Sequence, residues 1–304
     1  MRAVRFEEYG GVDVLNVEDV PTPVPGPGQV LVQVKAAGIN PGEAKVRDGL
    51  LHELFPATFP SGQGSDLAGV VAGLGTGAVG LTVGENVIGY TDNRASQAEY
   101  VLVEAEHLTP KPDAVPWEVA GGLFVVGATA YAAVRAVAPG PGDTVVVAGA
   151  AGGVGSIAVQ LAKLTGAAVI GLASLPNHDW LAAHGVIPVA YGDGVTDRIR
   201  HAAPKVDAFI DTQGGGYVQL AIELGVSPER IDTIANFDAV AQYGVKAEGN
   251  AAGASAGALA QLAGLLVLGQ LEVPIATTFP LEDVRAAYRL VAQGHVRGKI
   301  VLIP

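Results

Sequence analysis

The residues best placed to do chemistry in this sequence are a group of small ones that follows an apolar run. They form the pattern A-x-G-x-x-G, with loop residues Ala150, Gly152, Gly153, Val154 and Gly155. Ala150 stands where the common fingerprint has its first glycine, Gly152 lets backbone approach a pyrophosphate, and Gly155 lets a helix pack close. Backbone N–H groups and the helix dipole then hold the phosphate charge without a lysine. The pattern predicts a dinucleotide site, and a glycine-rich turn in another α/β protein is the alternative.

The segments on either side of this loop are the elements that must position it. Thr144–Val147 is a β-branched run typical of a strand buried on both faces. After the loop, Ile157, Leu161 and Leu164 recur at helical spacing. Strand, glycine loop and helix in this order are the context that dinucleotide binding requires.

The rest of the chain divides into two parts with different predicted secondary structure. Residues 1 to about 120 contain short alternating runs separated by Gly, Asn and Asp turns, which predicts a small β-barrel or sandwich. Beyond that point predicted strands and helices alternate, which indicates a parallel sheet with its ligand at the carboxyl ends of the strands. A helix over Leu281–Gln293 and a strand over Gly298–Ile303 would return the chain to the first domain. A length of 304 residues fits two such domains.

Composition excludes several classes of function. A net charge of -12 and a pI near 4.8 disfavour nucleic acid and anionic membranes as partners, because the long-range field repels both. The absence of cysteine excludes disulfides, thiolate nucleophiles and cysteine-bound zinc. The first residues do not resemble a secretion signal, so we expect a cytoplasmic protein.

One long uncharged stretch, Gly249–Leu271, raises the question of a membrane span. Its length would cross a bilayer, but it contains several glycines and amides and no flanking aromatic belt. Leu259, Leu262 and Leu266 make a helical stripe instead. We therefore expect a buried helix and no membrane insertion.

Seven short motifs in a fixed order resemble one family. They are AGINPGEAKVRDG (37–49), GSDLAGVVAGLG (64–75), VGENVIGY (83–90), AEYVLVE (98–104), GATAY (127–131), GAAGGVGSIAVQLAK (149–163) and GKIVLIP (298–304). Together they resemble the medium-chain dehydrogenase/reductase superfamily, most closely its zinc-free, zeta-crystallin-like quinone oxidoreductases.

The resemblance implies an α/β protein with two domains. The first is a GroES-like domain, a partly open β-barrel made of residues 1–121 and 267–304. The second is a Rossmann domain with a doubly wound parallel sheet, made of residues 122–266. The resemblance also implies a cleft between the domains for cofactor and substrate, and a homodimer.

The resemblance argues against a catalytic metal. The zinc-dependent alcohol dehydrogenases of the superfamily place a cysteine where this chain has Asn40, and a histidine followed by glutamate where it has Ser65 and Asp66. The six histidines show no paired ligand spacing that would replace them. We therefore expect no bound metal.

The end of the second predicted strand of the nucleotide domain bears on the choice of cofactor. An NAD enzyme has an acid there, whereas this strand ends in Ser174, which can donate to a 2′-phosphate. In the resembling family a tyrosine ending the next strand also holds the phosphate, and Tyr191 matches it. The family's basic residue falls on Pro176 or Asn177, a departure for which His178 could substitute. We predict NADPH rather than NADH; a helix N-cap is an alternative, compatible role for Ser174.

Three further residues are candidates for the reacting site through the resemblance. Asn40 and Thr129 match positions that line the nicotinamide pocket; their alternatives are a turn residue before proline and an ordinary helix hydroxyl. Lys45 stands where many relatives have a tyrosine near the substrate. It could hydrogen-bond an oxyanion, or donate a proton if burial makes the ammonium more acidic, or be a solvated surface lysine. Asp66 is expected to be structural and Lys299 to lie at the surface.

The segment after the strand at 231–235 supplies the substrate candidates. Asn236, Phe237 and Tyr243 would lie by the nicotinamide if the doubly wound order holds. The many small apolar residues favour a hydrophobic, planar substrate.

These observations lead to one main function and two alternatives. The main hypothesis is a metal-free, NADPH-dependent reductase that transfers hydride to a quinone or to the β-carbon of an α,β-unsaturated carbonyl compound. The second is a nucleotide-binding protein without turnover, because related chains serve as lens crystallins or membrane-associated scaffolds. A zinc alcohol dehydrogenase is the third.

Overall fold

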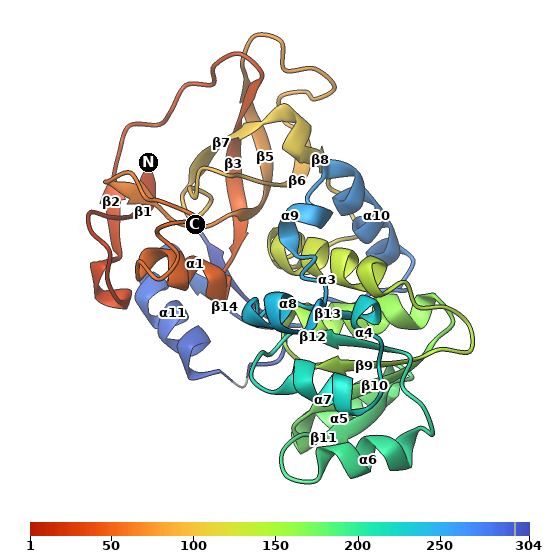
Figure 1. Cartoon of the computed structure of the whole chain (residues 1–304). Coiled ribbons are helices and arrows are strands. Elements are labelled where there is room, and N and C mark those ends of the chain that lie inside the picture. The colour runs from red at the N-terminus through yellow and green to blue at the C-terminus, as the bar shows by residue number, and fades with distance from the viewer. Residues whose placement is uncertain (295) are drawn as a thin grey trace. The chain divides into compact units, whose positions relative to one another are not determined.

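The computed structural model describes residues 1–294 and 296–304 as two compact units (Figure 1). The first unit is Met1–Val125 with Ser255–Gly269 and Val273–Pro304, and the second is Val126–Ala254 with Gln270–Glu272. His295, one of the six histidines considered as metal ligands, lies outside the described residues. The first unit is the expected GroES-like fold and the second the expected Rossmann fold.

The strand pairs of the first unit are antiparallel, except for β14 with β15, which is parallel. One sheet has the order β14-β15-β3-β5-β6-β8, with β7 also paired to β3, and a small sheet has the order β2-β1-β4. The strands are β1 (Arg2–Phe6), β2 (Asn16–Asp19), β3 (Gln29–Gly38), β4 (Ser61–Gly62), β5 (Asp66–Leu74), β6 (Asn86–Tyr90), β7 (Tyr100–Glu104), β8 (Leu108–Pro110), β14 (Ile275–Pro280) and β15 (Lys299–Ile303). The terminal strand therefore closes the N-terminal barrel, because β15 pairs with β3.

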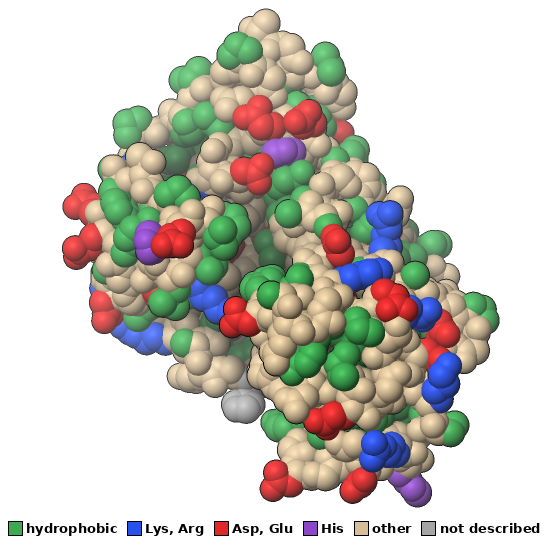
Figure 2. Space-filling model, in the orientation of Figure 1, with side chains coloured by type: hydrophobic (Ala, Val, Ile, Leu, Met, Phe, Trp, Pro, Cys, Tyr) green, Lys and Arg blue, Asp and Glu red, His purple; other side chains and the backbone are tan. Residues whose placement is uncertain are grey.

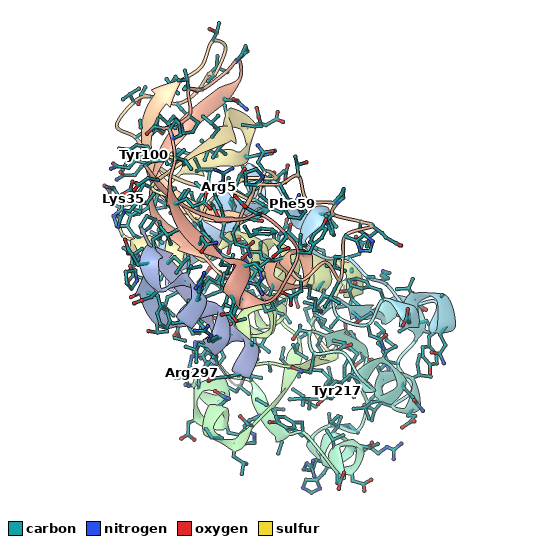
Figure 3. The ribbon with its side chains drawn as sticks, turned by 90° about the vertical axis from the view of Figure 1, so that its left-hand side faces the viewer. Arg5, Lys35, Phe59, Tyr100, Tyr217 and Arg297 are labelled. Carbon is teal, nitrogen blue, oxygen red and sulfur yellow. The ribbon has the colours of Figure 1, made fainter. Side chains whose placement is uncertain are left out.

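Alternation along β3 builds the core of this unit. Val30, Val32 and Val34 are buried and pack in one apolar cluster with residues of β5 and β7, while Lys35 lies partly exposed on the same strand. Figure 3 shows Lys35 and Tyr100 of β7 on the same side of the molecule. The period-2 pattern thus correctly predicts a half-buried strand.

The helices of the first unit include one that the sequence analysis had grouped with the nucleotide domain. They are α1 (Pro41–Arg47), α2 (Trp117–Gly121), α10 (Ala256–Val267) and α11 (Val284–Gln293). The expected boundary at 267 separates α10 from this unit, whereas α10 packs against β6 and β8. Among the described residues, no helix is long and apolar enough to cross a membrane.

The second unit is a parallel sheet flanked by helices (Figure 1). Its order is β11-β10-β9-β12-β13, and each neighbouring pair is parallel. Its strands are β9 (Thr144–Ala148), β10 (Ala168–Ala173), β11 (Ile187–Ala190), β12 (Ala208–Asp211) and β13 (Ile231–Thr233). The strand order reverses between β9 and β12, and ligands of such sheets bind at the carboxyl ends of the strands at this point.

Helices follow these strands in the expected alternation. They are α3 (Phe124–Val137), which begins at the unit boundary, then α4 (Gly153–Leu164), α5 (His178–Ala183), α6 (Val195–Ala202), α7 (Tyr217–Glu223), α8 (Asp238–Tyr243) and α9 (Asn250–Gly253). Val146 and Phe209 of the sheet share one buried cluster with Ile199 of α6 and Val218 of α7. Val145 and Val147 are also fully buried, so β9 is covered on both faces as predicted.

A buried carboxyl group lies in the edge strand β13. Asp232 is fully buried, its Oδ1 accepts the backbone N–H of Glu248 at 2.7 Å, and its Oδ2 has no partner in the described part of the chain. Burial raises the pKa of Asp232 from 3.8 to about 7, and the Glu248 N–H only partly opposes this. The folded chain therefore binds this proton more tightly than the unfolded chain does.

The position of Asp232 predicts a pH-dependent stability. Between about pH 4 and 7 the unfolded carboxyl is ionised while the folded one is protonated, so this group's contribution is fully present below pH 4 and is lost as pH rises to 7. The loss is about 4 kcal/mol at most. Urea unfolding of wild type and Asp232→Asn from pH 4 to 8 measures it. The variant should gain on wild type as pH rises, and parallel profiles would contradict the assignment.

Candidate functional site

The glycine loop joins β9 to α4 at the point where the strand order reverses. Gly149 has a left-handed backbone (φ +74°), which L side chains rarely adopt. Gly152 is the N-cap of α4, and no side chain caps the helix there. The first N–H groups of α4 are therefore not satisfied by a cap side chain and can receive an anion.

The structure accounts for alanine at the first fingerprint position. Ala150 is fully buried, and its N–H donates to Leu172 O of β10 at 3.0 Å. A Cβ added to Gly171 of β10 would lie only 2.9 Å from the Ala150 Cβ. A glycine on the neighbouring strand thus provides the space that the fingerprint usually obtains within the loop.

Gly155 has the packing role that the pattern predicts. A Cβ at this position would collide with the carbonyl oxygen of Gly149 and lie 2.9 Å from the Cα of Ala150. The helix therefore approaches the loop at backbone distance. Gly153 and Val154, between the fingerprint glycines, form the first residues of α4.

The tip of β10 carries a hydroxyl group and no carboxylate. Ser174 is half-buried, and its Oγ accepts a hydrogen bond from Asn177 Nδ2 at 3.0 Å rather than capping the following turn. The Ser174 O–H is left able to donate. His178 is held close by, with Nε2 3.3 Å from Ala173 O.

Tyr191 follows β11 and is 45% exposed. The adjacent turn is held by Arg198, whose guanidinium donates to Ala190 O at 3.0 Å and Tyr191 O at 3.2 Å. Burial, together with Asp211, raises the pKa of Tyr217, which begins α7 (Figure 3). Sequence analysis missed Arg198 and Tyr217, which lie on the helices that follow β11 and β12.

The carboxyl end of β12 forms the other side of the switch point. Thr212 Oγ1 donates to Ala148 O at 2.7 Å, which ties β12 to the start of the glycine loop. Asp211 is fully buried and accepts the N–H groups of Gln213 and Gly214 at 2.9 and 2.8 Å. These contacts fix the loop edges around the glycine turn.

The three substrate candidates have different surroundings. Asn236 Nδ2 donates to Gly215 O at 3.2 Å, Phe237 is 65% exposed, and Tyr243 packs partly against the core of the second unit. Phe237 alone presents a large apolar surface to solvent. Their contact with substrate stays a prediction.

In the first unit, Asn40 begins α1 immediately after β3. Its backbone N–H donates to Glu43 Oε2 at 3.1 Å, and Pro41 occupies the first helical position, which is a typical helix start. The side chain is 3% exposed, and its Nδ2 donates to Glu43 Oε1 at 3.0 Å.

Lys299 was expected at the surface, and this expectation was wrong. The residue is 3% exposed, and its Nζ donates to Asn40 Oδ1 at 2.6 Å, Ile39 O at 2.9 Å and Asp66 Oδ2 at 3.1 Å. Asp66, fully buried, also accepts the N–H of Val125 at 2.9 Å, in agreement with a structural role. A buried charge requires such partners. The acidic partner, Asp66, lies on β5 of the sheet that also contains β15.

Glu43 connects this cluster to α11. Its carboxylate accepts hydrogen bonds from the N–H of Ser65 at 3.1 Å and from the hydroxyl of Tyr288 at 2.9 Å. Burial, and then the charge of Asp66, raises the pKa of Glu43, whereas the Asn40 hydrogen bonds and the Lys299 ammonium oppose this rise. Burial raises the pKa of Tyr288 well above its usual value, so the phenol stays protonated and donates, while Gln63 and Gln97 donate to it.

Lys45 and Thr129 are the remaining two candidates. Lys45 is exposed on α1. Thr129 is a buried residue of α3, 5% exposed, in the second unit. The structure thus brings Asn40 together with Lys299, Asp66 and Glu43 in one unit, and the glycine loop together with the tip of β10 in the other.

Charged groups in the described parts form no cluster that could hold a metal. No three His, Asp or Glu residues there come together in a way that could hold a metal ion. On the face that Figure 2 shows, lysine and arginine side chains are interspersed with acidic ones.

Comparison with known proteins places these features in a family. The family model described as "Alcohol dehydrogenase GroES-like domain" matches residues 26–113 of this chain. The family model described as "Zinc-binding dehydrogenase" matches residues 181–302. The solved structure of the quinone oxidoreductase from Coxiella burnetii is 30% identical, with a TM-score of 0.90 over 100% of this chain and 99% of that one. The chain belongs to the quinone oxidoreductases of the medium-chain dehydrogenase/reductase superfamily.

Two further comparisons show how far this similarity extends. The human quinone oxidoreductase is 36% identical over 178 residues, 57% of this chain and 53% of that protein. The chain thus spans about half the length of that relative in the alignment. The Escherichia coli quinone oxidoreductase complexed with NADPH is 24% identical, with a TM-score of 0.89 over 100% of both chains, and shows the shared fold.

The backbone contact at Gly155 generates a stability prediction for this family member. Gly155→Ala should lower the free energy of unfolding by about 1–3 kcal/mol, because its Cβ meets backbone that cannot move aside. Gly264→Ala in α10 is the control: nothing lies within 4 Å of its added Cβ, so the helix should gain up to about 1 kcal/mol. Urea unfolding measures both, and equal effects would contradict the close packing.

Proposed function

We propose that this chain is a metal-independent, NADPH-dependent reductase that transfers hydride to a quinone or to the β-carbon of an α,β-unsaturated carbonyl compound. The observation that carries the proposal is the β9–loop–α4 unit at the switch point of a parallel sheet. Its glycine N-cap leaves the helix N-terminus open to an anion. A pyrophosphate fits that N-terminus.

The tip of β10 supports NADPH over NADH. Ser174 presents a hydroxyl donor, and the residues after it, Leu175–Asn177, carry no carboxylate that would repel a 2′-phosphate. His178 and Tyr191 are the neighbouring groups that would add hydrogen bonds to that phosphate. The absence of an acid here also removes the usual partner of an NAD ribose.

The surroundings of Asn40 support metal independence. In the resembling zinc enzymes a thiolate would occupy this position, but here an amide accepts from the Lys299 ammonium at 2.6 Å. That ammonium also contacts Asp66, the residue that follows Ser65 at the other zinc-ligand position. A fixed positive charge in contact with these positions opposes the entry of a divalent cation.

The proposed reaction requires little acid–base chemistry from the protein. The cofactor, when bound, supplies the hydride, and the acceptor oxygen gains negative charge as its conjugated system is reduced. The protein's contribution is to orient the two reactants and provide a hydrogen-bond donor for that oxygen. The Asn40 amide is the donor that we assign to this oxygen.

Turnover is tested directly by following the absorbance of NADPH and NADH in parallel, with a panel of quinones and enones and with chelator present. We expect faster oxidation of NADPH, unaffected by chelation. Cofactor binding without turnover of any acceptor would favour the non-catalytic alternative, and loss of activity with chelator would refute metal independence.

Cofactor choice is tested at the tip of β10. Ser174→Asp should weaken NADPH binding roughly tenfold to a hundredfold, because it removes a donor and adds a charge that repels the phosphate, while NADH binding changes less. Ser227→Asp is the matched control, since it adds the same charge before β13, at the opposite end of the strands. Fluorescence titration of each reduced cofactor measures both, and equal losses of NADPH and NADH binding would contradict the phosphate contact.

A further inference from the structure

Asn40 is held by two charged side chains that make opposite demands on its amide. The Lys299 ammonium donates to Asn40 Oδ1 at 2.6 Å, and the Glu43 carboxylate accepts from Asn40 Nδ2 at 3.0 Å. An ammonium can only donate and a carboxylate can only accept. The two charges therefore select one of the two orientations of the amide.

The rejected orientation would be costly. Rotating the amide by half a turn would direct its N–H groups at the Lys299 ammonium and its oxygen at the Glu43 carboxylate. Both contacts would then be repulsive, and the site is almost completely shielded from water, since Asn40 and Lys299 are each 3% exposed. A single charged neighbour would give a weaker preference than this pair does.

One N–H of the amide is left over. Asn40 Nδ2 makes a single hydrogen bond in the described part of the chain, to Glu43, so its second proton has no acceptor there. Its oxygen already accepts the short Lys299 bond. The available capacity of Asn40 toward a ligand is thus a donor of fixed direction.

The ammonium itself is held rigidly. Its three protons have three acceptors, namely Ile39 O, Asn40 Oδ1 and Asp66 Oδ2. Gly38 leaves room for one of these acceptors, because a Cβ there would lie 2.5 Å from Asp66 Oδ2. The charge has no free proton with which to act on a ligand directly.

We propose that Lys299 is a positioning residue, which together with Glu43 fixes the Asn40 amide as a hydrogen-bond donor toward the acceptor oxygen of the substrate. This inference rests on the proposed function for its ligand. Lys299 does not transfer a proton or touch the reactants. It acts through the direction and polarisation of the Asn40 N–H.

A double-mutant cycle separates this role from a merely structural one. Lys299→Met and Asn40→Ala should each lower kcat/KM by roughly tenfold to a hundredfold, mainly through kcat. In the Asn40→Ala background, Lys299→Met should cost less than about threefold more, because its effect passes through the missing amide. Full additivity of the two losses would overturn the proposal.

Two further variants keep the test sharp. Lys299→Arg retains a buried cation that can donate to Asn40, and it should recover part of the kcat lost in Lys299→Met. Lys35→Met, which removes a lysine of β3 in the same unit (Figure 3), should leave activity unchanged. Failure of Lys299→Arg to exceed Lys299→Met in kcat, with both folded by circular dichroism, would count against the proposal.

A second readout does not depend on turnover. In wild-type protein labelled with ¹⁵N-asparagine, the side-chain amide of Asn40, assigned by its loss in Asn40→Ala, should exchange with solvent at least tenfold more slowly than that of exposed Asn93. Addition of a quinone from the panel should shift the Asn40 signal. Rapid exchange would overturn the fixed amide even if the enzyme is active, whereas a protected amide with no turnover would count against the proposed function alone.

Discussion

The buried ammonium of Lys299 is the interaction on which the first unit depends. A charge removed from water is tolerated only when its protons and its charge are matched, and here the three acceptors lie beside one another only when β15, β3 and β5 are paired. The same contact that closes the barrel with its terminal strand also positions Asn40. Stability of the fold and the geometry of the candidate active site therefore share one set of hydrogen bonds.

Close backbone approach is the corresponding constraint in the second unit. Gly149, Gly155 and Gly171 each lack a Cβ where neighbouring atoms would contact one. The loop can accept alanine at its first fingerprint position because the space is provided by β10 instead. The fingerprint therefore requires enough free volume around the turn, and it does not require a glycine at each of its positions.

Under the proposed function, the cluster around Asn40 would be a polarised site that acts without a metal. In the resembling zinc enzymes a divalent ion would act on the substrate oxygen. In this chain the Lys299 ammonium donates to the Asn40 amide oxygen, and one amide proton of Asn40 is donated to Glu43. Tyr288 also donates to Glu43 and accepts hydrogen bonds from two glutamines. The result is a neutral donor held by charges on both sides, which suits a reaction whose hydride comes from a cofactor.

The sequence by itself determined the local units and their order. The strand before Ala148, the glycine loop, the helix after it and the alternation in β3 follow from period and turn chemistry, which act between near neighbours. Only the tertiary structure decided that Lys299 is buried, because its partners Asn40 and Asp66 lie 259 and 233 residues away, and a lysine before an apolar run is ordinarily a surface residue. The placement of α10 against β6 and β8 was decided in the same way, since its uniformly apolar surface carries no information about which core it joins.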